Sequence, residues 1–316
     1  VLGARLSLVW SRPEQHERLA RHFGLLLRAA VRGGCTSVLH VSSIAVADHV
    51  TPQHMVSESD PVPALEAMPS SYDRFKLRSE QIIDEVCSAS AGIKAWTHLR
   101  ISGIFSNDPA CIQLTSIRRQ ALVAIAVPTA IDFNSSRNVG HALALVLERH
   151  LAPAVAASEG CSGGAAGYSG RHVFYYTRGA RGPVPYWHHI ADYRRANAIW
   201  YGLWLPAWLG GVLVPRAGDL LRRLGTPLAS SLAYLMAVAI AEHTADNTLF
   251  RSAFPEIAEV EETIFDCFLR IRSRAEATHA KARLPVRADV VVSAALLSAM
   301  PIFRWLRGRA FTTRRP

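Results

Sequence analysis

The chain has 316 residues, half of them hydrophobic, which is enough to bury a sizeable core in one large domain or two. Its net charge is +10, but the basic residues are almost all arginines spread along the chain, which argues against a nucleic-acid partner and favours a membrane surface as the anionic partner. Five widely spaced cysteines without a C-x-x-C pair indicate reduced thiols, and thirteen histidines without a ligand motif indicate no metal site.

The first predicted elements are a helix and then a strand. From Glu17 to Arg32, apolar residues recur on one face, as in an amphipathic helix. After a Gly-Gly turn, the run from Ser37 to Val41 is short and apolar, so it predicts a buried strand. This strand ends on two hydroxyl side chains, Ser42 and Ser43.

A polar, proline-rich connection leads from Ser43 to a helix predicted over Asp73 to Val86. The connection could border a ligand pocket or be an ordinary surface loop, and the residues alone do not decide between the two. Tyr72 and Lys76 stand at i and i+4 at the start of the helix, so both side chains project from one face.

These residue types suit proton transfer in a redox reaction. A free tyrosine has a pKa of about 10, and the cation of Lys76 would favour the phenolate and lower that pKa. Tyr72 could then exchange a proton with a secondary alcohol or a carbonyl while a hydride moves to or from a nicotinamide ring, with Ser43 orienting the oxygen. The alternative interpretation is an exposed helix turn with a solvated lysine.

Further along, Ile93 to Leu99 predicts another strand, and Asn138 is expected to cap a helix that starts at Val139. Four motifs thus occur in a fixed order, VLHVSSIAV, SYDRFKLRSEQIIDEV, IKAWTHLRISGIFSND and FNSSRNVGHALALVLE. Together they resemble the extended short-chain dehydrogenase/reductase family, and within it the branch of 3β-hydroxysteroid dehydrogenases and sterol-4α-carboxylate 3-dehydrogenases. The resemblance covers about Glu17 to Ala144 well and the rest loosely.

The resemblance implies an α/β fold, a Rossmann-like NAD(P)-binding parallel sheet with helices on both faces. It also implies an oxidoreductase that oxidises a sterol or steroid 3β-hydroxyl to a ketone with NAD or NADP. Only 16 residues precede the helix at Glu17, too few for the glycine-rich strand, turn and helix that hold the pyrophosphate. We therefore expect the sheet to be incomplete at its N-terminal side.

The resemblance also assigns site residues. The catalytic set is Ser43, Tyr72 and Lys76, with Ser42 as a substitute for the serine. The residues expected beside the cofactor are Ser42, Tyr72, Lys76, Ile101, Gly103 and Ile104. Three residues depart from the family pattern, since Ile101 replaces a proline, Phe105 a tyrosine and Ser106 a glycine, which weakens the cofactor prediction.

The second half is expected to be mostly helical. We predict that residues 1–155 form the C-terminal part of the nucleotide-binding domain, that 156–170 form a flexible linker, and that 171–316 form a substrate-side region. The glycines at 164, 167 and 170 have the spacing of a nucleotide-binding turn but belong to that linker. A strand over 171–176 and a helix from Tyr186 should follow, in which Tyr186, Trp187 and Tyr193 stack on a ligand or pack in the core.

Three uncharged runs, 196–215, 224–241 and 290–303, precede a basic tail. They predict attachment to a membrane, at the cytoplasmic face and in the endoplasmic reticulum, which would suit a sterol that partitions into lipid. The alternative is a hydrophobic helical cap and the interface of a homodimer. Two other functions stay open, a catalytically silent relative with a binding or scaffold role, and a related reductase or nucleotide-sugar epimerase with the same triad.

Overall fold

The computed structural model describes most of the first half of the chain and part of the second. The described residues are 13–47, 55–68, 70–106, 111, 113–114, 117–118, 121, 123–125, 129–158, 169–179, 181–199, 203–205, 216, 223 and 244–279. The glycines at 164 and 167 and the runs 224–241 and 290–303 lie outside them.

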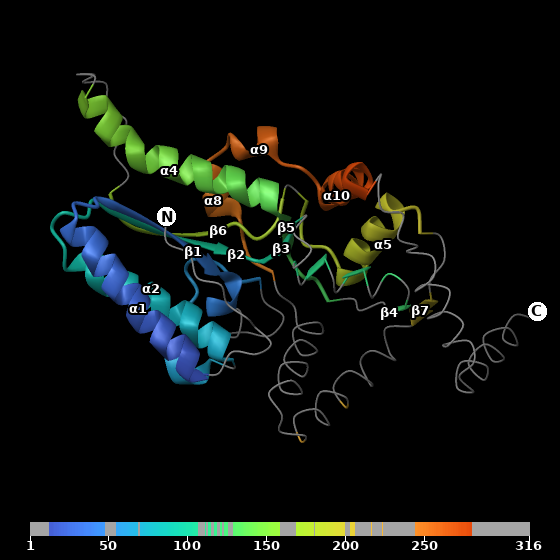
Figure 1. Ribbon diagram of the computed structural model, residues 1–316, viewed down its shortest axis with the longest axis horizontal. Helices are drawn as coiled ribbons and strands as arrows, with labels where there is room; N and C mark the ends of the chain where they lie inside the picture. The colour runs from blue at the N-terminus through green and yellow to red at the C-terminus, as the bar shows by residue number, and fades with distance from the viewer. Residues whose placement is uncertain are drawn as a thin grey trace, which may run out of the picture.

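A three-stranded parallel sheet forms the centre of the molecule. Its strands are β1 (Ser37–Ser43), β2 (Ala95–Ile101) and β6 (Gly170–Tyr175), in the order β1-β2-β6. Ser43 is opposite Ile101 in the register, and Ala95 is opposite Gly170. Helices lie on both faces, with α1 and α2 on one side and α4 on the other (Figure 1). This arrangement confirms the predicted α/β fold.

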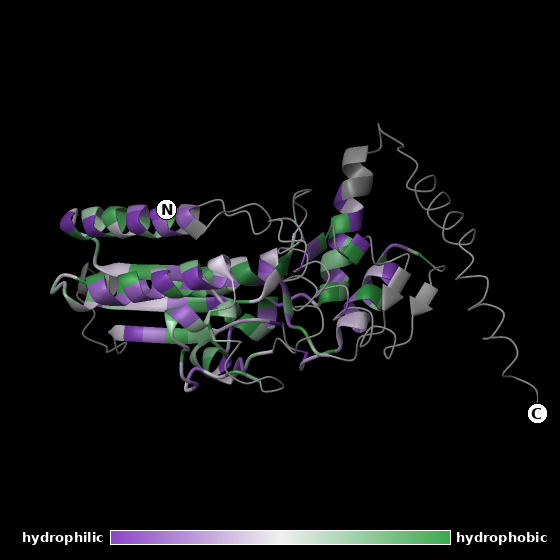
Figure 2. Cartoon of the chain, turned by 90° about the horizontal axis from the view of Figure 1, so that it is seen from below, coloured by the Kyte–Doolittle hydropathy of each residue, from purple (hydrophilic) through white to green (hydrophobic). Residues whose placement is uncertain are grey.

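Two helices cover the first face. Helix α1 (Pro13–Arg32) is amphipathic, and Figure 2 shows hydrophilic and hydrophobic residues alternating along it. Helix α2 (Ser71–Ser88) begins after Ser70, whose hydroxyl accepts a hydrogen bond from the amide of Asp73 at 3.1 Å. The two helices bury one apolar cluster between themselves and the sheet, made of Ala20, Leu27, Phe75, Ile82, Ile83, Val86, Cys87 and Ile93.

Helix α4 (Ser136–Ser158) covers the second face, and its start corrects the expected cap. The hydroxyl of Ser135 accepts a hydrogen bond from the amide of Asn138, so the helix begins three residues before Val139. The side chain of Asn138 is buried. Its Nδ2 donates to the backbone oxygen of Glu262, and its Oδ1 accepts a hydrogen bond from the backbone amide of Glu262, with N···O distances of 2.9 Å each. Asn138 therefore ties α4 to the C-terminal segment instead of capping the helix.

The remaining strands are short and pair in parallel. β3 (Gly103–Phe105) pairs with β5 (Phe133–Ser135), and β4 (Val123–Ile125) pairs with β7 (Leu203–Leu205). The other helices are the 3-10 turns η1 (Ile44–Val46) and η2 (Leu65–Ala67) and the α-helices α5 (Tyr186–Ala196), α8 (Thr248–Ala253), α9 (Ile257–Val260) and α10 (Ile264–His279).

The second half of the chain returns to the central sheet. Strand β6 follows the predicted linker yet occupies the edge position beside β2, and Phe250 of α8 packs on Phe174 of β6 with ring centroids 5.9 Å apart. Within α5, Tyr186 and Tyr193 are buried in a cluster with Phe105 and Phe268, so these two tyrosines pack in the core. The division of the chain at 155 and 171 stays a prediction.

The described part of the first uncharged run contains β7, which is a strand paired with β4. Among the residues that the structure describes, no helix combines the length and the apolar character needed to cross a membrane.

Gly103 is required by close packing. A Cβ atom at this position would lie 2.6 and 2.8 Å from two ring carbons of Phe133, whose ring is held by Phe105 and His189. Gly103→Ala is therefore expected to lower the free energy of unfolding by about 1–3 kcal/mol in urea denaturation. The matched control is Gly140→Ala on the exposed side of α4, where no atom lies within 4 Å and stability should rise slightly. Equal stability of the wild type and Gly103→Ala would contradict this prediction.

Candidate active site

One face of α2 carries four polar residues at a spacing of four, Tyr72, Lys76, Glu80 and Asp84. This spacing places the side chains in a row along the helix. Tyr72, Lys76 and Glu80 face the carboxyl-terminal parts of β1 and β2. Asp84 lies farther back and binds Trp96 and His98 of β2 and Arg171 of β6. In an open parallel α/β sheet, ligands bind outside the carboxyl ends of the strands, so the end of the row at Tyr72 is the candidate site.

The structure brings Tyr72 and Ser43 together. Ser43 is the last residue of β1, is buried, and accepts a hydrogen bond from the amide of Ala45 at 3.2 Å. The side chain of Ser43 lies close enough to the Tyr72 phenol to act on its pKa. A phenol and an aliphatic hydroxyl thus share one position at the carboxyl end of a strand, which is an arrangement that can hold a substrate oxygen.

The protonation of Tyr72 differs from the sequence-based expectation. Burial raises the pKa of this phenol, while the side chain of Ser43 acts in the opposite direction and Asp73 raises the pKa further. The Lys76 ammonium lies over the ring, 5.9 Å from its centroid, rather than beside the hydroxyl. The predicted lowering of the tyrosine pKa is therefore wrong for this structure, because burial disfavours the phenolate more than its neighbours favour it.

Lys76 is held against β1 by one hydrogen bond. Its Nζ donates to the backbone oxygen of Val41 at 3.1 Å. Burial lowers the pKa of Lys76 to about 8, and the carboxylate of Glu80 acts in the opposite direction. An ammonium group has three N–H donors, and within the described residues only this one is used. Lys76 therefore has donors to spare beside Tyr72.

The shifted pKa of Lys76 predicts how stability depends on pH. Folded Lys76 titrates at about 8 instead of 10.5, so between these values the unfolded chain binds more protons and stability rises with pH. From pH 8 to 9.5, the free energy of unfolding of the wild type should rise by roughly 1–2 kcal/mol relative to Lys76→Met. Urea denaturation of both proteins measures this difference, in which all other titrating groups cancel. A flat or falling difference would contradict the burial of a titrating ammonium.

Ser42 faces a different partner from Ser43. Its buried hydroxyl donates to Oε1 of Glu80 at 2.5 Å. The same carboxylate accepts two hydrogen bonds from Arg100, at 3.0 and 2.7 Å, and Arg100 donates to the hydroxyl of Tyr175 at 2.7 Å. Because Glu80 already holds the Ser42 hydroxyl, the structure places Ser42 in a buried ion-pair network and not beside Tyr72.

The other residues predicted beside the cofactor lie around β3. Ile101 is buried in an apolar cluster with Leu99, Val139 and Phe174, so its side chain belongs to the core. With no proline at this position, β2 continues through Ile101, which pairs with Ser43. Gly103 and Ile104 are partly exposed in β3, at the carboxyl side of the sheet. The family-based assignment is therefore not supported for the side chain of Ile101.

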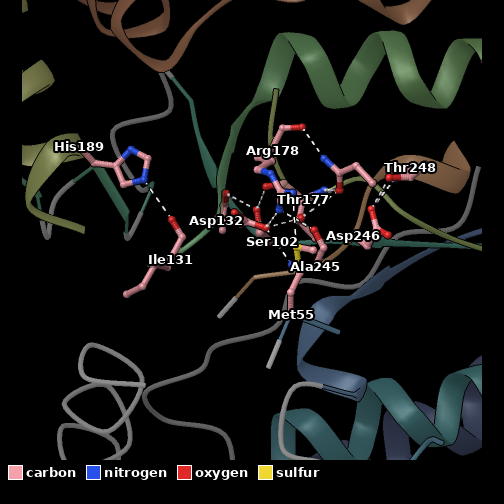
Figure 3. Close-up of polar contacts among 12 residues, drawn as sticks. Met55, Ser102, Ile131, Asp132, Thr177, Arg178, His189, Ala245, Asp246 and Thr248 are labelled. Atoms are coloured by element: carbon pink, nitrogen blue, oxygen red, sulfur yellow. Dashed lines mark hydrogen bonds and ion pairs between the residues drawn. The ribbon is translucent and has the colours of Figure 1, made fainter. Parts of the chain in front are cut away.

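Sequence reasoning missed a second polar cluster, at the start of β5 and the end of β6. The carboxylate of Asp132 accepts hydrogen bonds from Thr177 at 2.7 Å, from Arg178 at 2.7 Å and from the amide of Ala245 at 3.0 Å (Figure 3). Burial raises the pKa of Asp132, and the Arg178 guanidinium acts against that rise. The available signals were an aspartate directly before β5 and an arginine three residues after the end of β6.

This cluster borders a pocket that is open to solvent. The pocket lies between the loop that follows β6, the start of α5 and the segment before α10. Its polar lining comes from Asp132, Arg178, Arg181, His188, His189, Asp192, Glu261, Glu262 and Thr263. The lining combines these polar side chains with the apolar side chains of Ile131, Phe133, Val184 and Ile264.

Among the comparisons with known proteins, the one with solved structures finds similar proteins. No family model matches the chain, and no curated protein matches it in sequence. Among solved structures, gox2253 has a TM-score of 0.62 at 16% identity, covering 88% of this chain and 77% of that one. UDP-N-acetylglucosamine 4-epimerase from Bacillus cereus has a TM-score of 0.56 at 12% identity, covering 86% and 76%.

A third similar structure is a short-chain dehydrogenase/reductase superfamily protein from Agrobacterium tumefaciens, crystallised with bound NAD. Its TM-score is 0.54 at 16% identity, covering 90% of this chain and 80% of that one. At such identities the likeness shows the fold, which is a Rossmann-type α/β fold shared with short-chain dehydrogenases/reductases.

Proposed function

We propose that this protein is an NAD(P)-dependent oxidoreductase of the short-chain dehydrogenase/reductase type that interconverts a secondary alcohol and a ketone. The observation that carries the proposal is the meeting of Tyr72 with Ser43 at the carboxyl end of β1, with the Lys76 ammonium one helical turn away. The fold supports it, since several structures of this fold belong to enzymes of that type, one of them with bound NAD.

The residues fit a nicotinamide nucleotide. Lys76 is largely buried at the carboxyl edge of the sheet, and its unused N–H donors suit the hydroxyls of a ribose. Gly103 and Ile104 are close enough to that edge to border the ring. When bound, such a cofactor supplies or accepts the hydride at the substrate carbon. We propose NAD or NADP, because none of the residues described around the site distinguishes the two.

The side chains of the site would handle the proton. In the oxidation, Tyr72 takes the hydroxyl proton of the alcohol, and in the reduction it returns a proton to the carbonyl oxygen. Ser43 holds that oxygen by a hydrogen bond. The positive charge of Lys76 offsets part of the penalty that burial imposes on the phenolate, so the phenolate is most accessible while Lys76 is protonated.

For the substrate, we propose the 3β-hydroxyl of a sterol or steroid, with attachment to the cytoplasmic face of a membrane. The order of the four sequence motifs and the three uncharged runs support this choice. A nucleotide sugar, as in a related reductase or epimerase, is the second candidate. The pocket beyond β6 supports it through Arg181, because the exposed guanidinium of this residue suits a phosphate.

Two measurements test the proposal. Fluorescence titration of the full chain with NADH and NADPH should give saturable binding, and a panel of 3β-hydroxysteroids and nucleotide sugars should then identify an oxidised or reduced product. Turnover of a steroid and not of a nucleotide sugar would support the sterol proposal, and the reverse would support the second candidate. Absence of saturable binding would overturn the enzyme proposal in favour of a silent relative.

A further inference from the structure

The end of β1 is joined to α2 at three consecutive residues. Val41 accepts the hydrogen bond of Lys76, Ser42 donates to Glu80, and Ser43 lies next to Tyr72. Two of these three contacts hold the proposed catalytic residues, and the middle one holds Glu80. The position of Ser43 relative to Tyr72 and Lys76 therefore depends on a contact that lies outside the proposed catalytic set.

Glu80 is itself fixed by a residue of the neighbouring strand β2. Arg100 of β2 binds both of its carboxylate oxygens, and the two side chains are 2% and 3% exposed. Arg100 continues to Tyr175 of β6, so a single network crosses all three strands and ends on α2. Two parallel hydrogen bonds define the orientation of a carboxylate much better than one, so Glu80 has little freedom to move.

Glu80 also determines the electrostatic surroundings of Lys76. It follows Lys76 by one helical turn on the same face, and its negative charge favours the ammonium form against the burial that opposes it. The other titratable groups that face Lys76 are Tyr72 on α2 and His40 on β1. His40 is neutral, because burial lowers its pKa to about 3, so Glu80 supplies the negative charge at this end of the row.

We propose that Glu80 is a positioning residue, which holds Lys76 protonated and keeps the end of β1 in place so that Ser43 meets Tyr72. This inference rests on the proposed function for its effect on turnover, but the effect on Lys76 itself does not. The Glu80–Arg100 pair would then serve the site as well as the fold. A purely structural pair would leave the titration of Lys76 unchanged.

The scarcity of lysine allows a direct test. The chain has three lysines, so selective labelling with ¹³C,¹⁵N-lysine gives three Nζ signals, which Lys94→Arg and Lys281→Arg assign. In Glu80→Gln, the full-length protein should show Lys76 titrating about one pH unit lower than in the wild type. Glu85→Gln is the control, since Glu85 is on the same helix, is 61% exposed and pairs with Arg78, and it should leave Lys76 unchanged.

A second variant covers the case in which Glu80→Gln does not fold. Glu80→Gln with Arg100→Met removes both charges of the pair, and Lys76 should again titrate lower than in the wild type. An unchanged Lys76 titration in the folded variants would overturn the proposal, whether or not the protein turns over a substrate.

Turnover supplies the second readout. In Glu80→Gln, kcat should fall about tenfold at pH 8 with KM nearly unchanged. The alkaline limb of the pH profile of kcat should shift to lower pH by the same amount as the Lys76 titration. Glu80→Asp should restore part of this displacement. A loss of kcat by the same factor at every pH, with the alkaline limb at the same pH as in the wild type, would overturn the positioning role. If the wild type shows no turnover while Lys76 still shifts, the proposed function fails and the inference about Glu80 stands.

Discussion

Tyr72→Phe is expected to lower turnover by about 10²–10⁴-fold while leaving the binding of NADH or NADPH within a factor of about two. The substitution keeps the ring that lies under the Lys76 ammonium and removes only the hydroxyl that lies near Ser43. The loss should therefore appear in kcat, because proton exchange with the substrate oxygen is removed and the nucleotide contacts are kept. Absorbance of the reduced nicotinamide measures the rate, and fluorescence titration measures the binding.

The control for this variant is Tyr186→Phe. Tyr186 is a buried tyrosine in the apolar cluster of α5, away from Ser43 and Lys76, so its variant should turn over at nearly the wild-type rate. Turnover of Tyr72→Phe at the wild-type rate would end the assignment of Tyr72 as the acid and base.

Arg100→Met should cost about 3–5 kcal/mol in the free energy of unfolding, the largest loss of stability that we expect from a single substitution. The guanidinium is replaced by an apolar side chain of similar length, which leaves the Glu80 carboxylate buried with only the Ser42 hydroxyl as a hydrogen-bond donor among the described residues. Removing one member of a buried ion pair is costly because the remaining charge has lost its partner and cannot reach water. Urea denaturation followed by circular dichroism measures the change.

Two comparisons identify the cause of that loss. The double variant Glu80→Gln, Arg100→Met should recover most of the stability, because no unpaired charge remains. Arg78→Gln removes the exposed pair with Glu85, whose side chains are 39% and 61% exposed, and should change stability by less than about 1 kcal/mol. Equal effects of Arg100→Met and Arg78→Gln would contradict the burial of the Glu80–Arg100 pair.

The sequence was sufficient for the features that depend on local periodicity. The strand from Ser37, the helix that bears Tyr72 and Lys76, and the helix from Tyr186 are all present, because each is marked by an apolar pattern with the correct repeat. The sequence also indicated that Tyr72 and Lys76 share a face, since that follows from helix geometry alone.

The features that depend on long-range burial were missed or misjudged. The tyrosine pKa was expected to fall, but the amount of burial that raises it becomes known only from the folded structure. The pairing of Glu80 with Arg100 joins residues 20 positions apart, and only the presence of an arginine inside a strand hinted at it. Ile101 was assigned by family position, although its side chain points into an apolar cluster.

The edge position of β6 bears on how the protein could be divided for study. Strand β6 pairs with β2 along six residues, and it comes from the chain beyond residue 169. A fragment that stops at residue 155 would leave one side of β2 with bare amide and carbonyl groups next to apolar side chains such as Leu99. An unpaired strand edge of this kind pairs with strands of other molecules, so we expect that fragment to aggregate on expression. A fragment that extends through α10 should not aggregate in this way.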